Sequence, residues 1–188
     1  LLPLVVGIMS IAGELYPILY AGFVQKYMKI AIQLTLLSGI SIILTAIMQF
    51  LISLLQANGY YSYSMIFSII GGVGKLTFLF ITAPLSEISI YSIALSNIVL
   101  ALIVSICVLI KLGHLISLPF FDVVLPLLSV IIMYMVVKIL LSVVGGYLGL
   151  FIAVVLGGGI YFVLSLPIAI NYFKVIASRF LTKQEENT

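Results

Sequence analysis

Charged residues are scarce in this sequence. Eight Lys and Arg and five Asp and Glu account for 7% of the 188 residues, whereas 64% are hydrophobic, and the mean hydropathy is +1.43. A soluble domain of this length needs many more polar side chains to cover its surface. The small net charge of +3 argues against nucleic-acid binding. The composition predicts an integral membrane protein.

Cysteine and histidine are almost absent as well, since Cys107 and His114 are the single examples. They exclude a disulfide framework, a metal cluster of cysteines and histidines, and a histidine-based catalytic triad within this chain. Three carboxylates, Glu14, Glu87 and Asp122, fall on separate stretches and form no catalytic group. We therefore expect no enzymatic activity, no cofactor and no metal.

Long apolar runs are abundant instead. A membrane-spanning helix needs about 20 mostly apolar residues. Six stretches meet this requirement: 2–22, 31–55, 63–84, 88–110, 121–143 and 147–171. They are longer than barrel strands and lack the strict alternation of polarity that barrel strands have. The sequence predicts an all-α, polytopic membrane helix bundle over residues 1–171 and a polar tail over residues 172–188.

Basic residues near the helix ends indicate the orientation, because cytoplasmic loops are enriched in Lys and Arg. One side of the predicted bundle holds Lys111 and the basic residues of the tail, and the other side holds Lys26 and Lys29. The excess on the first side predicts a cytoplasmic tail.

Polar residues recur at intervals of three and four on several predicted helices, which places them on one face of each helix. The runs comprise Gly7, Ser10 and Glu14; Ser38, Ser41, Thr45, Gln49, Ser53 and Gln56; Ser64, Ser68, Gly71, Gly72 and Lys75; and Ser89, Ser92, Ser96 and Asn97. Small and hydroxylated residues alone favour helix packing.

Two charged residues argue against packing as the whole explanation of these polar runs. A charged side chain costs at least ~2.5 kcal/mol at the centre of a membrane helix, so Lys75 and Glu14 favour a water-filled cavity or an opposite charge. The residues predicted to line such a cavity are Lys75, Ser68, Gln49, Glu14, Thr45 and Ser64.

The glycines before Lys75, in the segment GGVGK, suggest a phosphate-binding loop as an alternative. That motif reads G-x-x-x-x-G-K-[ST], but its first position here is Ile69 and the residue after Lys75 is Leu76. We interpret GGVGK as a close-packing patch that carries an inward-facing lysine. In the last helix, small residues spaced by four predict a packing ridge of Gly145, Gly149, Ala153, Gly157 and Tyr161.

Three segments resemble a known family. They are ELYPILYAG, FLISLLQANGYYSYSMIFSIIGGVGKLTFLFI and GGGIYFVLSLPI. Together they are similar to the C-terminal portion of stage V sporulation protein B-like polysaccharide biosynthesis proteins, which belong to the multidrug/oligosaccharidyl-lipid/polysaccharide exporter superfamily. The resemblance implies a two-lobed transporter of the bacterial plasma membrane, which moves lipid-linked glycans for the cell wall or spore envelope by alternating access.

The resemblance also implies partners. The six helices would be most of the second lobe, the N-terminal lobe would be their partner, and one lobe alone is not expected to transport. Lys75 would attract the pyrophosphate of an undecaprenyl-linked glycan, while serines and glutamines would contact sugar hydroxyls. The turn ANGYYSY lacks the acidic residue expected of lipid II flippases, which argues against lipid II itself.

Two other functions stay open. A cation-coupled multidrug exporter of the same superfamily would need a membrane carboxylate, for which Glu14 is the candidate. A membrane scaffold without transport would use the polar runs for packing and would pair Lys75 with a carboxylate.

Overall fold

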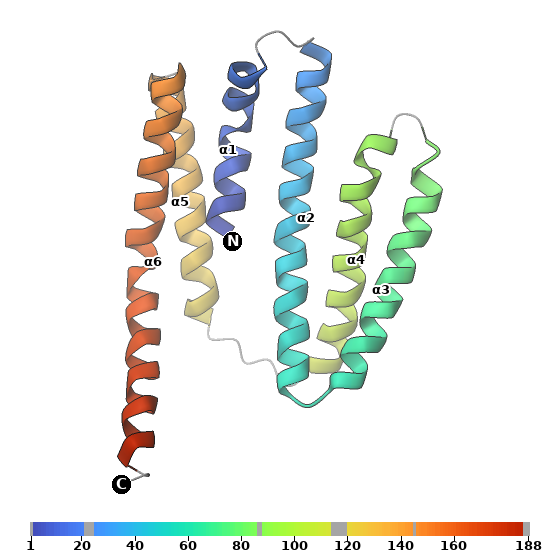
Figure 1. The fold of residues 1–188 in the computed structure, drawn as a ribbon, viewed down its shortest axis with the longest axis vertical. Coiled ribbons are helices and arrows are strands. Elements are labelled where there is room, and N and C mark those ends of the chain that lie inside the picture. Colours follow the sequence, from blue (N-terminus) through green and yellow to red (C-terminus); the bar gives the residue numbers. More distant parts are fainter. Residues whose placement is uncertain (1, 21–24, 86–87, 114–119, 145, 186–188) are drawn as a thin grey trace. The chain divides into compact units, whose positions relative to one another are not determined.

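The structure, a computed structural model, describes residues 2–20, 25–85, 88–113, 120–144 and 146–185. They form six helices (Figure 1): α1 (Leu2–Leu19), α2 (Gln25–Ala57), α3 (Tyr61–Thr82), α4 (Ser89–Leu112), α5 (Phe120–Val144) and α6 (Gly146–Glu185). The prediction of an all-α, multi-helical fold is confirmed.

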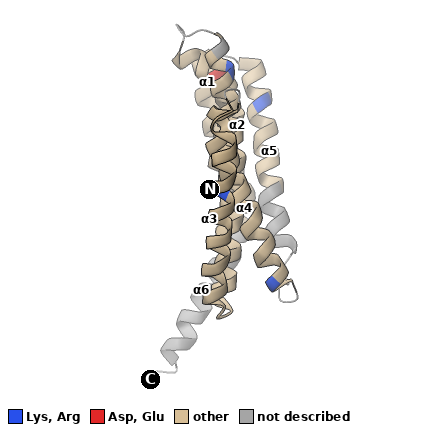
Figure 2. Cartoon of the chain, turned by 90° about the vertical axis from the view of Figure 1, so that its right-hand side faces the viewer, with Lys and Arg blue, Asp and Glu red and all other residues tan. Residues whose placement is uncertain are grey.

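The described helices have the length and surface of membrane spans. Five of them contain a segment long and apolar enough to cross a membrane, and in α5 the described apolar segment, Leu128–Val144, is shorter. Large apolar side chains point outward, with Phe80 80% and Ile110 77% exposed. Figure 2 shows few charged residues along the described helices. These features support a multi-pass membrane protein, in which lipid would cover the outward apolar surfaces.

Two helices extend beyond the apolar stretches that predicted them. α2 begins at Gln25 instead of residue 31, and α6 continues to Glu185 through most of the expected tail. Hydropathy marks the part of a helix that suits hydrocarbon, whereas lysine, glutamine and glutamate are good helix formers outside it. The described helical segments therefore extend beyond the apolar runs.

The chain divides into two compact units, Leu1–Ser117 and Leu118–Thr188. In the first unit the helices pack in the order α1, α2, α4, α3, so that α3 lies against α4 and meets α2 mainly near their common turn (Figure 1). The core of this unit lies between α2 and α4 and consists of Met48, Leu51, Leu55, Ala101, Val104, Val108 and Leu112.

A glycine ends α2 and directs the chain into α3. Gly59 has a φ of +82°, Tyr60 N–H donates to the Leu55 carbonyl at 3.1 Å, and Gly59 N–H donates to the Gln56 carbonyl at 2.9 Å. These two bonds form a Schellman motif, which favours glycine at the left-handed position. The segment QANGYYSY thus makes a tight turn that holds the end of α2 beside the start of α3.

The second unit is the hairpin of α5 and α6. A Cβ atom built on Gly157 would lie 2.7 Å from Val137 Cγ2, so this glycine allows close approach of the two helices. Gly149, Ala153 and Gly157 are all buried, as the packing ridge predicted, while Gly145 lies outside the described residues.

Candidate functional site

The polar run on α2 lies between the two sides of the helix that pack on neighbours. Leu55 is part of the core with α4, and Thr35 faces α1, where its Oγ1 lies 2.7 Å from Tyr16 Oη. Successive residues turn by about 100° in an α-helix. Thr45 and Gln49 consequently fall between the α4 side and the α1 side of α2.

Lys75 lies on a flank of α3. Gly71 and Gly74 fix the side of α3 that faces α4, because a Cβ atom on either would meet side chains of α4. Ser64, Ser68 and Lys75 follow one another at helical spacing along one flank of that side. The side chain of Lys75 is half-buried there.

A hydrogen bond joins these two polar runs where α2 turns into α3. Gln56 Nε2 donates to Ser64 Oγ at 3.0 Å. Thr45 and Lys75 each stand about eleven residues from this bond along their helices, or roughly 16 Å, so they lie at a similar depth. The two runs share this bond at the α2–α3 turn. We call them the polar face, which comprises Thr45, Gln49, Ser64, Ser68 and Lys75.

The hydroxyl groups of the polar runs are largely satisfied within their own helices. Thr45 Oγ1 donates to the Ser41 carbonyl at 2.8 Å, and Ser68 Oγ donates to the Ser64 carbonyl at 2.9 Å. The same bond, to a carbonyl three or four residues earlier, recurs at Ser10, Ser53, Ser92 and Ser96. A hydroxyl bonded in this way needs neither water nor a partner helix. These residues therefore suit a packed interface as well as a cavity.

Lys75 and Gln49 differ from the hydroxyl residues. Within the described part of the chain, neither side chain forms a hydrogen bond or an ion pair. Both lie inside helical segments that are apolar enough to span a membrane. Because hydrocarbon offers no hydrogen-bond partner, an ammonium and an amide at such positions require water, a ligand or another protein group.

Glu14 is separated from the polar face. Within the first unit, α1 packs on α2 and reaches neither α3 nor α4. The side chain of Glu14 is exposed near the end of α1. The structure therefore excludes an ion pair between Glu14 and Lys75, and it separates Glu14 from the other five predicted cavity residues.

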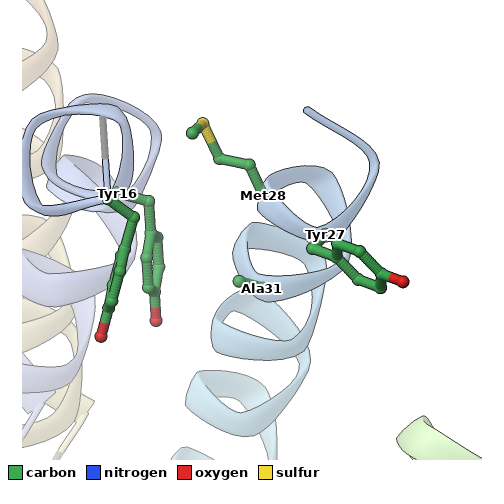
Figure 3. Close-up of a pocket in the computed structure, with 5 residues that line it drawn as sticks. Tyr16, Tyr27, Met28 and Ala31 are labelled. Carbon is green, nitrogen blue, oxygen red and sulfur yellow. The ribbon is translucent and has the colours of Figure 1, made fainter. Parts of the chain in front are cut away.

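A second feature, which the sequence did not predict, is a pocket at the other end of α2. It has a volume of about 340 Å³ and is lined by Tyr16, Tyr20, Tyr27, Met28 and Ala31. The rings of Tyr16 and Tyr20 are stacked 6.1 Å apart. Met28 extends from α2 toward Tyr16, whereas Tyr27 points away from it (Figure 3). The tyrosines on both sides of the α1–α2 connection were the sequence signal for this pocket.

The polar face can attract an anion and donate hydrogen bonds, but it offers no pair of groups for acid–base catalysis. Among the described residues, no cluster of three or more His, Cys, Asp or Glu is placed to hold a metal ion. Comparison of the chain with protein families, curated proteins and solved structures gives no match. A functional assignment therefore has to rest on the polar face.

Proposed function

We propose that this chain is part of a membrane exporter that moves a lipid-linked oligosaccharide or polysaccharide across a bacterial plasma membrane, and that the polar face lines its path. The observation that supports the proposal is the ammonium group of Lys75, half-buried in an apolar helix without a partner among the described residues. In this proposal the missing partner is the pyrophosphate that links the glycan to its lipid carrier.

The chemistry of the polar face suits such a substrate. Lysine binds phosphate groups as a point charge, and the amide of Gln49 can both donate to and accept from sugar hydroxyls. The apolar surface around the polar face would leave the lipid tail of the substrate in the bilayer. The second lobe required for alternating access would be a further partner of these helices.

A scaffold without transport is the second candidate, because the hydroxyl groups of the polar runs are satisfied inside their own helices. In a scaffold, another protein segment would cover Lys75 and Gln49. The cation-coupled exporter has less support, since its candidate carboxylate, Glu14, lies apart from the polar face.

Water access to the polar face distinguishes these functions. In a Cys107→Ala background, Ser68→Cys and Gln49→Cys should react with a membrane-impermeant maleimide in liposomes. Two controls give the reaction rate of cysteines without access to water. Ser96→Cys is at a fully buried position, and Phe80→Cys lies at an 80% exposed apolar position that lipid should cover. We expect the two polar-face cysteines to react at least tenfold faster than both controls. Equal, slow reaction at all four positions would reject the path and support the scaffold.

A binding arm of the same experiment tests the substrate class. Lys75→Gln should weaken binding of undecaprenyl pyrophosphate about 10- to 100-fold, as expected for the loss of a charge-assisted hydrogen bond, and Lys75→Arg should retain most of it. Lys138→Gln, an exposed lysine of α5, is the matched control. Unchanged binding by Lys75→Gln would remove Lys75 from the site.

A further inference from the structure

The tyrosines of the first unit gather at its two ends. One group lies where α1 ends and α2 and α4 begin, and the other lies at the turn between α2 and α3; the groups are Tyr16, Tyr20, Tyr27 and Tyr91, and Tyr60, Tyr61 and Tyr63. Tyr91 Oη donates to Gln33 Oε1 at 2.9 Å, which ties the start of α4 to α2 within the first group. Tyrosine is enriched at both membrane–water interfaces, so these groups mark the two boundaries of the bilayer.

The separation of Tyr91 from the second group fits the thickness of a membrane. α4 runs from Tyr91 in the first group to Lys111 beside the second, about 20 residues and hence ~30 Å, which equals the hydrocarbon thickness of a typical bilayer. At the first boundary, α1 and α2 project beyond the ends of α3 and α4 (Figure 1). The ammonium group of Lys111 thus lies where hydrocarbon meets the lipid headgroups.

The surroundings of Lys111 hold this ammonium in place but do not neutralise it. Lys111 Nζ lies 4.3 Å from the ring centroid of Tyr63 and 5.3 Å from that of Tyr60. The Tyr60 and Tyr63 rings meet edge to face at 6.0 Å, and Tyr63 in turn contacts Phe67. Cation–π contacts fix the position of an ammonium group without using its N–H groups as hydrogen-bond donors to an acceptor atom.

No anion for Lys111 is found within the described residues. The one carboxylate with a described side chain, Glu14, lies at the opposite end of the unit. The side chain of Lys111 is exposed. Its position on the last turn of α4 also places it beside the helix carbonyls, which favour a cation there.

We propose that Lys111, framed by Tyr60 and Tyr63, binds the phosphate of an anionic membrane lipid. The ammonium donates hydrogen bonds to the phosphate oxygens, and the two rings keep it at the depth of the headgroups. The site is independent of the polar face and of transport, because it lies at the end of α4 and requires only that the first unit spans a bilayer. Its role is to anchor the α2–α3 turn to the anionic lipids of one leaflet.

The chain contains no tryptophan, so a single introduced tryptophan reports on this site alone. Tyr63→Trp preserves an aromatic face for Lys111, and Tyr61→Trp, at a neighbouring 68% exposed position, is a second reporter in case the first disturbs folding. In nanodiscs of phosphatidylcholine, the tryptophan is quenched by increasing fractions of brominated phosphatidylglycerol or, in parallel, brominated phosphatidylcholine. Lys111→Gln and Lys111→Arg are compared with Lys29→Gln, an exposed lysine at the other end of the unit.

We expect the anionic lipid to be enriched about fivefold at the reporter relative to phosphatidylcholine, the preference that one lysine provides near a membrane surface. Lys111→Gln should abolish the enrichment, whereas Lys111→Arg, Lys29→Gln and Lys75→Ala should retain it. Equal quenching by both lipids, or enrichment that survives Lys111→Gln, would overturn the proposal. Relief of the quenching by millimolar inorganic phosphate would assign the site to a soluble phosphate and refute the lipid assignment.

Discussion

Two adjacent glycines in α3 test how tightly this helix packs on α4. A Cβ atom on Gly71 would collide with Val104 Cγ2 and would lie 3.0 Å from Leu100 Cδ1, whereas a Cβ atom on Gly72 would meet nothing within 4 Å. The two positions share a helix, a depth in the membrane and a residue type. Gly71→Ala and Gly72→Ala therefore differ mainly in the contact with α4.

The difference in stability between the two variants follows from two opposing effects. Replacing glycine with alanine inside a helix gains about 1 kcal/mol of helix propensity, and this gain applies at both positions. Overpacking costs typically ~1–3 kcal/mol, and it applies only at Gly71. Val104 cannot easily rotate away, because it is 1% exposed and a β-branched side chain has one strongly preferred rotamer in a helix. We expect Gly71→Ala to be about 1–3 kcal/mol less stable than Gly72→Ala.

Equilibrium unfolding in mixed micelles of dodecylmaltoside and sodium dodecyl sulfate, followed by circular dichroism, measures this difference. A double-mutant cycle with Val104→Ala adds a control, since removal of Cγ2 should relieve part of the penalty at Gly71 and give a coupling of ~0.5–3 kcal/mol. If Gly71→Ala were as stable as Gly72→Ala, the close approach of α3 to α4, and with it the placement of Lys75 on the flank of that contact, would be incorrect.

Two further predictions concern the other helix contacts. Tyr16→Phe and Thr35→Val each remove the 2.7 Å hydrogen bond between α1 and α2. In the same unfolding assay, we expect the double-mutant cycle of these two substitutions to give a coupling free energy of ~0.6 kcal/mol and no more than ~1.7 kcal/mol. Strictly additive effects would show that the bond contributes nothing. In the second unit, Gly157→Ala should destabilise the α5–α6 hairpin relative to Gly158→Ala, because only Gly157 faces Val137. Thermal unfolding of the two variants measures this difference. Equal melting temperatures would contradict the packing ridge.

The number and type of helices could be predicted because apolar length is read directly along the sequence. Six apolar stretches became six helices. The close-packing interpretation of GGVGK holds at Gly71 and Gly74 but not at Gly72, which points away from α4. Composition shows that a helix has a small-residue side, whereas the rotation of that side relative to the partner helix depends on contacts that the sequence does not specify.

The order of packing could not be predicted. α3 separates α2 from α4 along the chain, yet α2 packs mainly on α4. Helices that are apolar all round carry no stripe that selects one neighbour over another. The tyrosine pocket and the Lys111 site could not be predicted for a related reason. Each combines residues from helices whose adjacency is known only from the fold. Tyrosines beside predicted helix ends were the one available signal.

The hydroxyl residues of the polar runs say less about function than the Lys75 ammonium and the Gln49 amide do. Thr45 and Ser68 bond to carbonyls of their own helices, so the same sequence pattern is satisfied against lipid, against another helix or beside water. Lys75 and Gln49 have no local acceptor or donor of this kind in the described structure. A membrane helix can retain an ammonium there only if something outside the helix compensates its desolvation. If the proposed function holds, substitution of Ser68 by alanine should matter far less for binding of undecaprenyl pyrophosphate than substitution of Lys75 by glutamine, because the Ser68 hydroxyl is already bonded within its own helix.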